Sequence, residues 1–382
     1  MSNRVPSLSS EDAANARRQL RRRRTQAFLF VVPLLVFILF AFVAPITTML
    51  FRSVYNPTVA ELVPETLTML EDWEGETLPD PAVVTQMAID MKRMAGNRTS
   101  GKFADEINRA LPGMSSVIKS TARGLRRADD AELAANGAEM LLAENDRWAK
   151  PATWRAIRSA GQAYTSSYYL TAVDLEYDAE GEIIMRDTQI YKQLYTKTLK
   201  MALIITGLTM LLGYPLAFYM SQASPATANF LMVFVLLPFW TSLLVRTTAW
   251  IALLQAGGVV NSTLIWAGLI NEPIELLYNE FSTILAMTHI LLPFMVLPLY
   301  AVMRGIDSSF MRAAISMGSN PIGAWYKIYL PMSLPGLSAG ALLVFIISVG
   351  YYITPALVGG TDGQMISNII AFHMQVSNNW EL

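Results

Sequence analysis

The sequence predicts an all-α membrane protein that crosses the bilayer several times and carries a mainly helical polar insert. Of its 382 residues, 53% are hydrophobic and only 15% are charged, whereas a soluble globular protein carries about 25% charged residues. The hydrophobic residues gather in long runs with almost no charge, and the polar residues gather in one block, residues 52–190. These two distributions predict membrane-spanning helices beside a soluble domain.

The composition excludes several classes of chemistry. A formal net charge of −1 is not that of a general nucleic-acid binder, so no nucleic acid is expected as a partner. The lack of Cys excludes thiol catalysis, disulfides and Cys-based zinc sites. His289 and His373 are far apart in the sequence and have no neighbouring carboxylate cluster, so we expect two structural histidines. No metal, cofactor or enzymatic activity is therefore predicted.

The first transmembrane helix is predicted over residues 27–51, after a basic cytoplasmic tail at residues 1–26. Six arginines crowd the tail just before the run Ala27–Leu50, which holds no charge. Twenty-four residues at about 1.5 Å each cover about 36 Å, enough to cross a hydrocarbon core of about 30 Å. A cleavable signal peptide is the alternative, but its apolar stretch spans only about 7–15 residues. A retained anchor is the better interpretation.

Residues 52–190 are predicted to form a mainly helical domain outside the membrane. Ala82–Met94, Phe103–Ala110 and Ala131–Ala143 mix apolar and charged residues at helical spacing. Thr171–Gln189 has the pattern of a β-hairpin that turns around Ala179-Glu180-Gly181. No motif in the sequence of this insert indicates its role.

Four further apolar runs follow, which with the first make five predicted spans. They are Met201–Met220, Phe230–Leu254, Phe281–Met303 and Leu337–Val358. The link at residues 304–335 carries Arg304, Arg312 and Lys327, whereas Gln255–Glu280 contains three Glu and no Lys or Arg. Basic residues mark cytoplasmic loops, so the N-terminus is predicted in the cytoplasm and the insert on the other side.

Three side chains within the spans are candidates for a translocation path: Arg246, Trp250 and His289. A charge in hydrocarbon costs at least about 2.5–3.5 kcal/mol, so Arg246 faces water, pairs across helices or snorkels to the headgroups. His289 either faces a cavity or packs between helices. These alternatives stay open, with a structural or partner-contact role favoured for Arg246 because it would repel a cationic substrate.

The link at residues 304–335 is predicted to contain two short helices. Phe310–Met317 suits a first helix, Gly318 permits a left-handed turn, and Asn320-Pro321 caps and opens a second helix over Ile322–Tyr329. The alternative is an amphipathic interfacial helix anchored by aromatic residues.

This link carries a motif of a known family. Arg312-Ala313-Ala314 is followed by Gly318 and, nine residues later, by a segment whose matching positions are Ile328, Leu330 and Pro331. It resembles the cytoplasmic signature of permease subunits in ATP-binding-cassette (ABC) importers, which has Glu where this chain has Arg312. The resemblance implies that the second helix docks into a groove on an ATPase. The docking residues would be Ile322, Trp325 and Tyr326.

The resemblance extends over residues 191–382 and narrows the subfamily. Leu212–Ala217, Leu237–Thr247 and Thr354–Gly360 look like segments of spermidine/putrescine-type importer permeases. This implies a type I importer core with a translocation path for a polyamine. It further implies an ATPase dimer that uses the ATP, a second permease subunit, a periplasmic binding protein and a place in the bacterial inner membrane. Opines, ferric iron and amino-acid-like cations are the alternative substrates.

Two features depart from the resembled family. Its members have a short link where this chain has residues 52–190, and a core of about six spans where this chain has five. The insert either braces the binding protein or is a decoration, and the chain is expected to lack its last span. A membrane-anchored sensor or scaffold that works through the insert is the alternative from another class. An ion-coupled transporter is disfavoured because the spans hold essentially no carboxylates.

Overall fold

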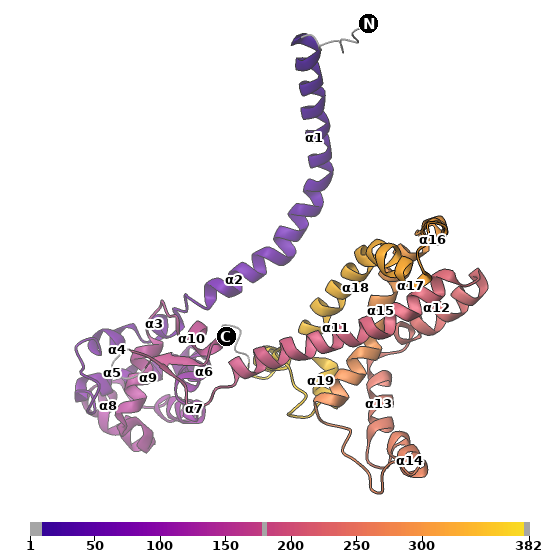
Figure 1. The fold of residues 1–382 in the computed structure, drawn as a ribbon. Helices are drawn as coiled ribbons and strands as arrows, with labels where there is room; N and C mark the ends of the chain where they lie inside the picture. The colour runs from indigo at the N-terminus through magenta and orange to yellow at the C-terminus, as the bar shows by residue number, and fades with distance from the viewer. Residues whose placement is uncertain (1–9, 178–181, 378–382) are drawn as a thin grey trace. The chain divides into compact units, whose positions relative to one another are not determined.

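The structure is a computed structural model that describes residues 10–177 and 182–377 (Figure 1). Contacts divide it into two compact units, one that runs to Leu170 and one that begins at Thr171. The predicted insert at residues 52–190 therefore divides, because its last twenty residues belong with the second unit. Each unit is described separately below.

The first unit begins with a long helix that contains the first predicted span. It comprises α1 (Ser10–Ile38), a π-helical turn η1 (Leu39–Val43) and α2 (Ala44–Arg52). Pro45 has no N–H to donate to the preceding turn, and the helix widens into the π-turn directly before it. Residues Arg21–Arg52 are long and apolar enough to cross a membrane.

The rest of the first unit is a helical domain with one hydrophobic core. Its core is centred on Phe103, Trp148 and Trp154, all fully buried. The Trp148 indole N–H donates to Thr121 Oγ1 over 2.9 Å, and that of Trp154 donates to the Trp148 carbonyl over 2.8 Å, so both large rings are buried without an unpaired donor. The helices are α3 (Thr58–Leu62), α4 (Pro64–Met69), α5 (Pro81–Gly96), α6 (Ser100–Ala110), α7 (Met114–Leu125), α8 (Asp130–Glu144), η2 (Asp146–Ala149) and α9 (Pro151–Ala160), and α10 (Ser167–Ala172) reaches the boundary between the units.

The two ends of this domain lie side by side. Tyr55 pairs with Tyr164 in an isolated antiparallel bridge, and their rings are 5.0 Å apart. The Asn56 N–H donates to Ala163 and the Thr165 N–H donates to Val54, both over 2.9 Å. The chain therefore leaves the domain beside the point where it enters. Adjacent ends of this kind allow a domain of about 110 residues to be inserted in the sequence between two spanning segments.

The second unit opens with the predicted hairpin. Strands β1 (Leu175–Tyr177) and β2 (Ile183–Met185) pair antiparallel, with Glu176 opposite Ile184. The hairpin is confirmed, and its predicted turn at Ala179-Glu180-Gly181 lies outside the described residues.

The helices of the second unit pack around α15 (Glu280–Arg304), which contacts α11, α12, α18 and α19. Glycines let these helices approach closely. A Cβ on Gly340 or Gly213 would meet Met295 at 3.0 and 2.9 Å, and one on Gly336 would meet Val302 at 2.9 Å. The other helices are α11 (Tyr191–Gln222), α12 (Pro225–Trp240), α13 (Leu243–Leu254), α14 (Val259–Trp266), α16 (Ser308–Ser316), α17 (Pro321–Ala324), η3 (Trp325–Tyr329), α18 (Leu330–Gly350), α19 (Ile353–Val358) and α20 (Ile366–Gln375).

Two of the predicted spans are wrong in their bounds. The run Phe230–Leu254 is broken at Thr241-Ser242: α12 ends at Trp240, and the Ser242 hydroxyl caps the next helix by accepting from the Val245 N–H. The last run is broken at Tyr351-Tyr352. Within the described residues, five helical segments are long and apolar enough to span: Arg21–Arg52, Tyr191–Gln222, Leu243–Trp266, Glu280–Arg304 and Pro321–Gly350.

Candidate functional site

The link between α15 and α18 folds as a helix–turn–helix, as its sequence predicts. The Asp307 carboxylate caps α16 by accepting from the Ser309 N–H over 2.7 Å, and this bond lowers the pKa of Asp307. Gly318 has φ +93°, a left-handed conformation that an L side chain rarely adopts. Asn320 then caps α17 by accepting from the Gly323 N–H, with Pro321 at the first helical position.

The second helix of the link does not end before the next span. The chain stays helical from Pro321 through the π-turn Trp325–Tyr329 into α18, which ends at Gly350. The prediction of a separate short helix and a span that begins at Leu337 is therefore wrong. Pro331 and Pro335 suggest breaks, but the π-turn lies just before Pro331 and the helix runs on.

One face of this helix is held against α11 by aromatic residues. Trp325 packs edge-on against Tyr214 at 5.8 Å, and the buried Tyr329 packs edge-on against Phe218 at 5.1 Å. The Tyr214 hydroxyl lies 2.9 Å from Ser333 Oγ. Sequence reasoning missed Tyr214 and Tyr329, although the four-residue spacing of Trp325 and Tyr329 marks one helix face.

A neighbouring face of the same helix, and the helix before it, are exposed. Ile322 and Tyr326 are 79% and 65% exposed. Arg312 and Ala313 are exposed and Ala314 is buried, while the Arg312 guanidinium donates to Ser308 Oγ over 2.8 Å in its own helix. Ile328 and Leu330 are half-buried and Pro331 is exposed. The structure thus separates the three predicted docking residues, with two facing out and Trp325 facing in.

The three candidates for a translocation path come together. The Trp250 and His289 rings are 5.6 Å apart in an edge-to-face arrangement that joins α13 to α15. Arg246 lies one turn before Trp250 on α13. Among the described residues, neither the buried Arg246 Nε nor the buried Thr354 hydroxyl on α19 has a hydrogen-bond partner, and α19 also packs on α13.

A glycine-rich turn after α19 closes on the start of α15. The Ser282 hydroxyl and the Tyr278 N–H both donate to the Val358 carbonyl, over 2.7 and 2.8 Å. A Cβ on Gly360 would meet the Tyr278 carbonyl at 2.6 Å. Sequence reasoning noted the motif Thr354–Gly360 but missed that its glycines serve close backbone packing.

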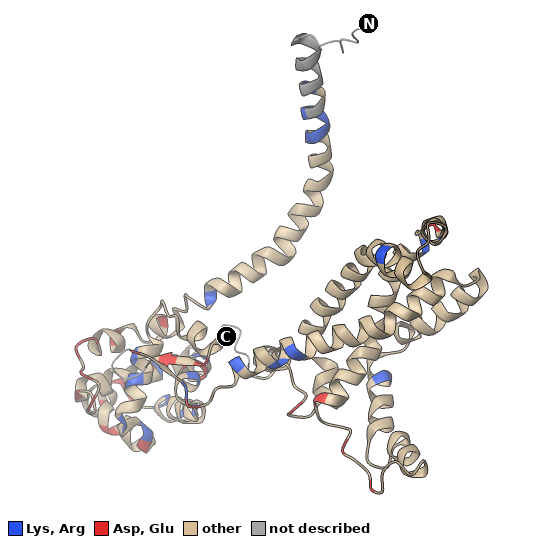
Figure 2. Ribbon diagram, in the orientation of Figure 1, with Lys and Arg blue, Asp and Glu red and all other residues tan. Residues whose placement is uncertain are grey.

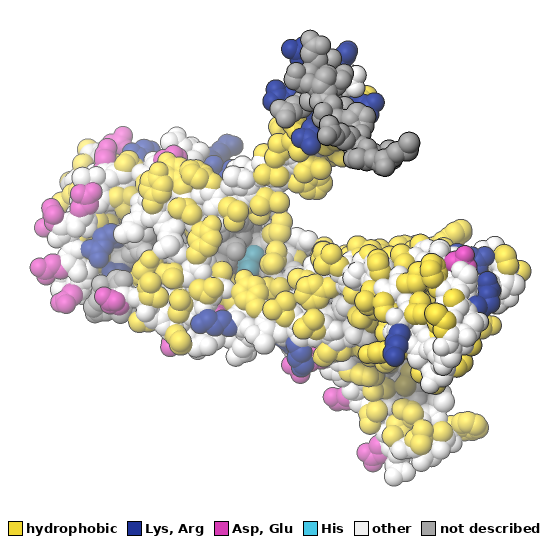
Figure 3. All heavy atoms as spheres, turned by 45° about the horizontal axis from the view of Figure 1, so that its top comes forward, with side chains coloured by type: hydrophobic (Ala, Val, Ile, Leu, Met, Phe, Trp, Pro, Cys, Tyr) yellow, Lys and Arg dark blue, Asp and Glu magenta, His cyan; other side chains and the backbone are white. Residues whose placement is uncertain are grey.

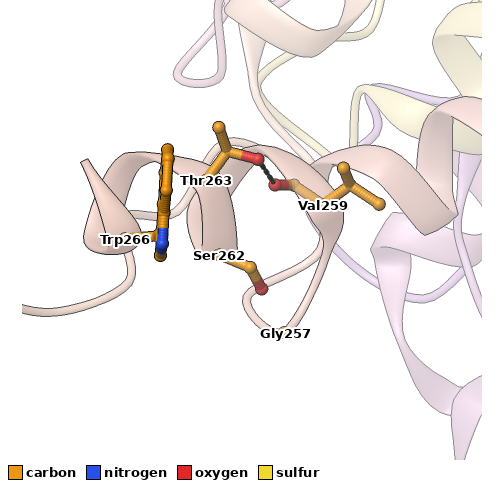
Figure 4. A pocket seen from close by; sticks show the side chains of 5 residues that line it. All are labelled: Gly257, Val259, Ser262, Thr263 and Trp266. Carbon is orange, nitrogen blue, oxygen red and sulfur yellow. Dashed lines mark hydrogen bonds between the residues drawn. The ribbon is translucent and has the colours of Figure 1, made fainter.

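Other surfaces offer less chemistry. A shallow depression on α14 is lined by Gly257, Val259, Ser262, Thr263 and Trp266 (Figure 4). The Thr263 hydroxyl donates to the Val259 carbonyl of its own helix, so it is not aimed at a ligand. Among the described residues, no three His, Asp or Glu side chains are grouped to hold a metal ion.

The spans, their glycine contacts and the exposed helix–turn–helix define a multi-pass α-helical membrane protein. Residues 210–376, all in the second unit, match the family described as binding-protein-dependent transport system inner membrane component. The chain belongs to this family. It is therefore the permease component of an ABC transporter in the inner membrane, and its family is one of transport components rather than enzymes.

Relatives with assigned roles match half of the chain. The spermidine/putrescine transport system permease protein PotB of Haemophilus influenzae is 35% identical over 191 residues, 50% of this chain and 67% of that protein. The PotB protein of Escherichia coli K12 is 31% identical over 191 residues, 50% of this chain and 70% of that protein. A solved bacterial ABC transporter involved in import of the acidic polysaccharide alginate aligns with TM-score 0.39 and 21% identity, over 49% of this chain and 70% of that chain.

Proposed function

We propose that this permease forms half of an import path for a polyamine of the spermidine or putrescine type. A periplasmic binding protein delivers the solute, a second permease completes the path, and an ATPase dimer drives it. The observation that supports this proposal is the similarity to two spermidine/putrescine permeases at 31–35% identity. The alternative of a membrane-anchored scaffold finds no support in this family membership.

The exposed face of the link is the proposed ATPase contact. Ile322 and Tyr326 present apolar surface with little cost to the fold, because neither is buried in this chain. Trp325 acts as an internal anchor, since its ring packs on Tyr214. The helix that carries these residues continues into α18, so a displacement at the link moves a span directly. Arg312 in place of an acidic residue gives this contact an extra positive charge.

The group Arg246, Trp250 and His289 is proposed to lie where the two permeases meet. A cation with an unsatisfied Nε in a span needs an acceptor. A polyamine is itself cationic, so an acidic or carbonyl group of the second permease fits Arg246 better than the substrate does. We expect Arg246→Ala to reduce recovery of the second permease, and unchanged assembly and uptake would remove Arg246 from the mechanism.

The proposed orientation places the N-terminus and the link in the cytoplasm and the insert in the periplasm. The supporting observation is the asymmetry of basic residues, with Arg304, Arg312 and Lys327 on one side. A cysteine placed at exposed Met317 should then be labelled by a membrane-impermeant thiol reagent only after the cells are opened. Labelling in intact cells would show that the link lies outside the cytoplasm and would contradict the proposed orientation.

Substrate and partners are tested by purifying the chain from its own membrane with its associated proteins. The proposal expects an ABC ATPase, a second permease and a soluble protein that binds spermidine or putrescine in a calorimetric titration. If the recovered binding protein does not bind polyamines, the proposed transporter would stand and the proposed substrate would be wrong. Recovery of the permeases without an ATPase would contradict the proposed assembly.

The ATPase contact is tested by Ile322→Asp. The change removes an exposed apolar side chain, so the fold should survive while ATPase recovery and ATP-driven uptake fall together. Leu269→Asp is the matched control, because Leu269 is also highly exposed and lies between α14 and α15, away from the link. Equal ATPase recovery from both variants would contradict the assignment.

A further inference from the structure

A dense band of arginines on α1 has no partner within the part of the chain that the structure describes. Arg18, Arg21, Arg22, Arg23 and Arg24 are all exposed, and no described acidic side chain forms an ion pair with them. Five positive charges within seven residues repel one another. An anionic partner that surrounds the band would relieve this repulsion.

The helix distributes the band around its axis. All five arginines lie within α1 (Ser10–Ile38) in helical conformation. Successive residues are about 100° apart, so the four consecutive arginines 21–24 cover about 300° of the circumference. Figure 3 shows dark blue side chains on several sides of this helix. Arginines placed around the whole helix can bind several small anions that surround it, whereas a flat anionic surface would contact one side only.

The position of the band along the helix identifies the anion. Figure 2 shows the blue of the arginines followed by a long tan stretch of the same helix, and the next charged residue in the sequence is Arg52 at the end of α2. The candidate span begins at Arg21 itself. Where this span enters a bilayer, the phosphates of the lipid headgroups surround the helix at the level of the arginines. Guanidinium groups bind phosphate oxygens in pairs, which ammonium groups do not.

We propose that Arg18 and Arg21–Arg24 form a girdle that binds the phosphates of acidic phospholipids and fixes the depth of the first span. The apolar segment from Ala27 to Phe51 is about 37 Å long, against about 30 Å of hydrocarbon, so length alone leaves the helix free to slide or tilt. Binding at one end removes that freedom. Because both leaflets contain headgroups, the inference does not depend on the orientation of the chain.

The test uses fluorescence at single cysteines, which this Cys-free chain allows without background substitutions. A donor dye is attached at Gln26→Cys, just after the band, and the full chain is placed in nanodiscs that contain acceptor-labelled phosphatidylglycerol or acceptor-labelled phosphatidylcholine. We expect the acidic lipid to be enriched near this dye by clearly more than the factor of about five that one arginine at a charged surface supplies, because the band holds five arginines. Raising the salt concentration should lower this enrichment.

A matched control lies on the same helix. A dye at Phe51→Cys reports the far end, where Arg52 is the one nearby cation on the helix, and should show a much smaller preference. Equal enrichment at both ends, or none at Gln26→Cys, would overturn the proposal. These comparisons use the native arginines, so they hold even where an arginine variant fails to insert.

Variants then separate the chemistry. Replacing all five arginines by Gln should abolish the enrichment, and replacing them by Lys should retain part of it, because charge remains without paired hydrogen bonds. Inorganic phosphate at constant ionic strength should not compete. Full competition by free phosphate, or displacement of the lipid by RNA, would show a general anion site and would reject the lipid girdle.

Discussion

The helical domain of the first unit and the helices of the second unit bury apolar side chains in opposite ways. The domain gathers its apolar residues, Trp148 and Trp154 among them, into one core of fully buried side chains. The second unit has two small buried clusters and leaves large apolar residues outside. Those outside include Leu203, Leu211, Phe230, Val233, Leu342 and Ile346.

The two regions are therefore held together by different forces. In water, removal of apolar surface drives the domain to fold. In a bilayer, lipid satisfies apolar surface equally well, so close packing at small residues and hydrogen bonds between helices must supply the specificity. The contacts of Gly340 with Met295 and of Tyr214 with Ser333 are of that second kind.

The largest effect is expected from truncating the core of the domain. Trp148→Ala removes a fully buried ring and leaves the Thr121 hydroxyl without its donor, at a cost of about 3–5 kcal/mol. Hydrogen exchange of the full chain in nanodiscs should show faster exchange across α5–α9 and unchanged exchange in α11, α15 and α18. Loosening of both units together would contradict the comparison.

A smaller but still large effect is expected from a glycine of the second unit. Gly340→Leu forces a side chain against Met295 and costs at least about 1–3 kcal/mol, because a packed interface accepts added volume poorly. Gly207→Leu is the control, since a Cβ there would meet nothing within 4 Å. The thermal unfolding midpoint of the detergent-solubilised chain should fall for Gly340→Leu and not for Gly207→Leu. An equal fall in both variants would show that helix propensity, and not packing, determines the loss of stability.

The sequence predicts much of this fold because long apolar runs and helix caps are local signals. Gly318 and Asn320 act as the sequence predicts, since a left-handed turn or a cap depends on a few neighbouring residues. The break at Thr241-Ser242 was missed because two helices in series have the same apolar composition as one.

The candidate sites were predicted only in part, for a related reason. The family resemblance implies Ile322, Trp325 and Tyr326 together as docking residues, and the first and last of them are exposed. The inward position of Trp325 depends on Tyr214, more than a hundred residues earlier. The pairing of Trp250 with His289 likewise joins two helices whose register no local pattern encodes. Polar contacts between distant helices need the fold itself.

A moderate effect is expected at Asp174, a cap that joins the hairpin to α11. The carboxylate accepts from the N–H groups of Ile190, Tyr191 and Lys192 over 2.7–3.0 Å. Burial alone would raise the pKa of Asp174, but these three donors hold it below its usual value. Asp174→Ala should cost about 0.5–2 kcal/mol and speed exchange in the first turn of α11.

The pH dependence of this cap follows from the lowered pKa. The carboxylate contributes its stabilisation above its unfolded pKa of about 3.9 and loses it as the pH falls through the lower folded value. Protection of the first turn of α11 should therefore be constant near neutral pH and decline only in acid. A decline between pH 6 and 8, or one that persists in Asp174→Ala, would contradict this assignment.

The smallest effects are expected from two ion pairs at or near the surface, one in each region. Asp105 and Lys119 are 3.1 Å apart in the domain, and Glu280 and Lys200 are 2.9 Å apart between α15 and α11. Exposed pairs contribute at most about 1 kcal/mol, and salt screens them. Glu280 also stands in the first turn of α15, where a negative charge is favourable. Glu280→Gln should therefore lower the thermal midpoint of the full chain slightly more than Asp105→Asn at low salt, and the two variants should converge at high salt. A larger loss at Glu280 that persists in high salt would mean that a polar contact between helices contributes more beside a bilayer than on the surface of the domain.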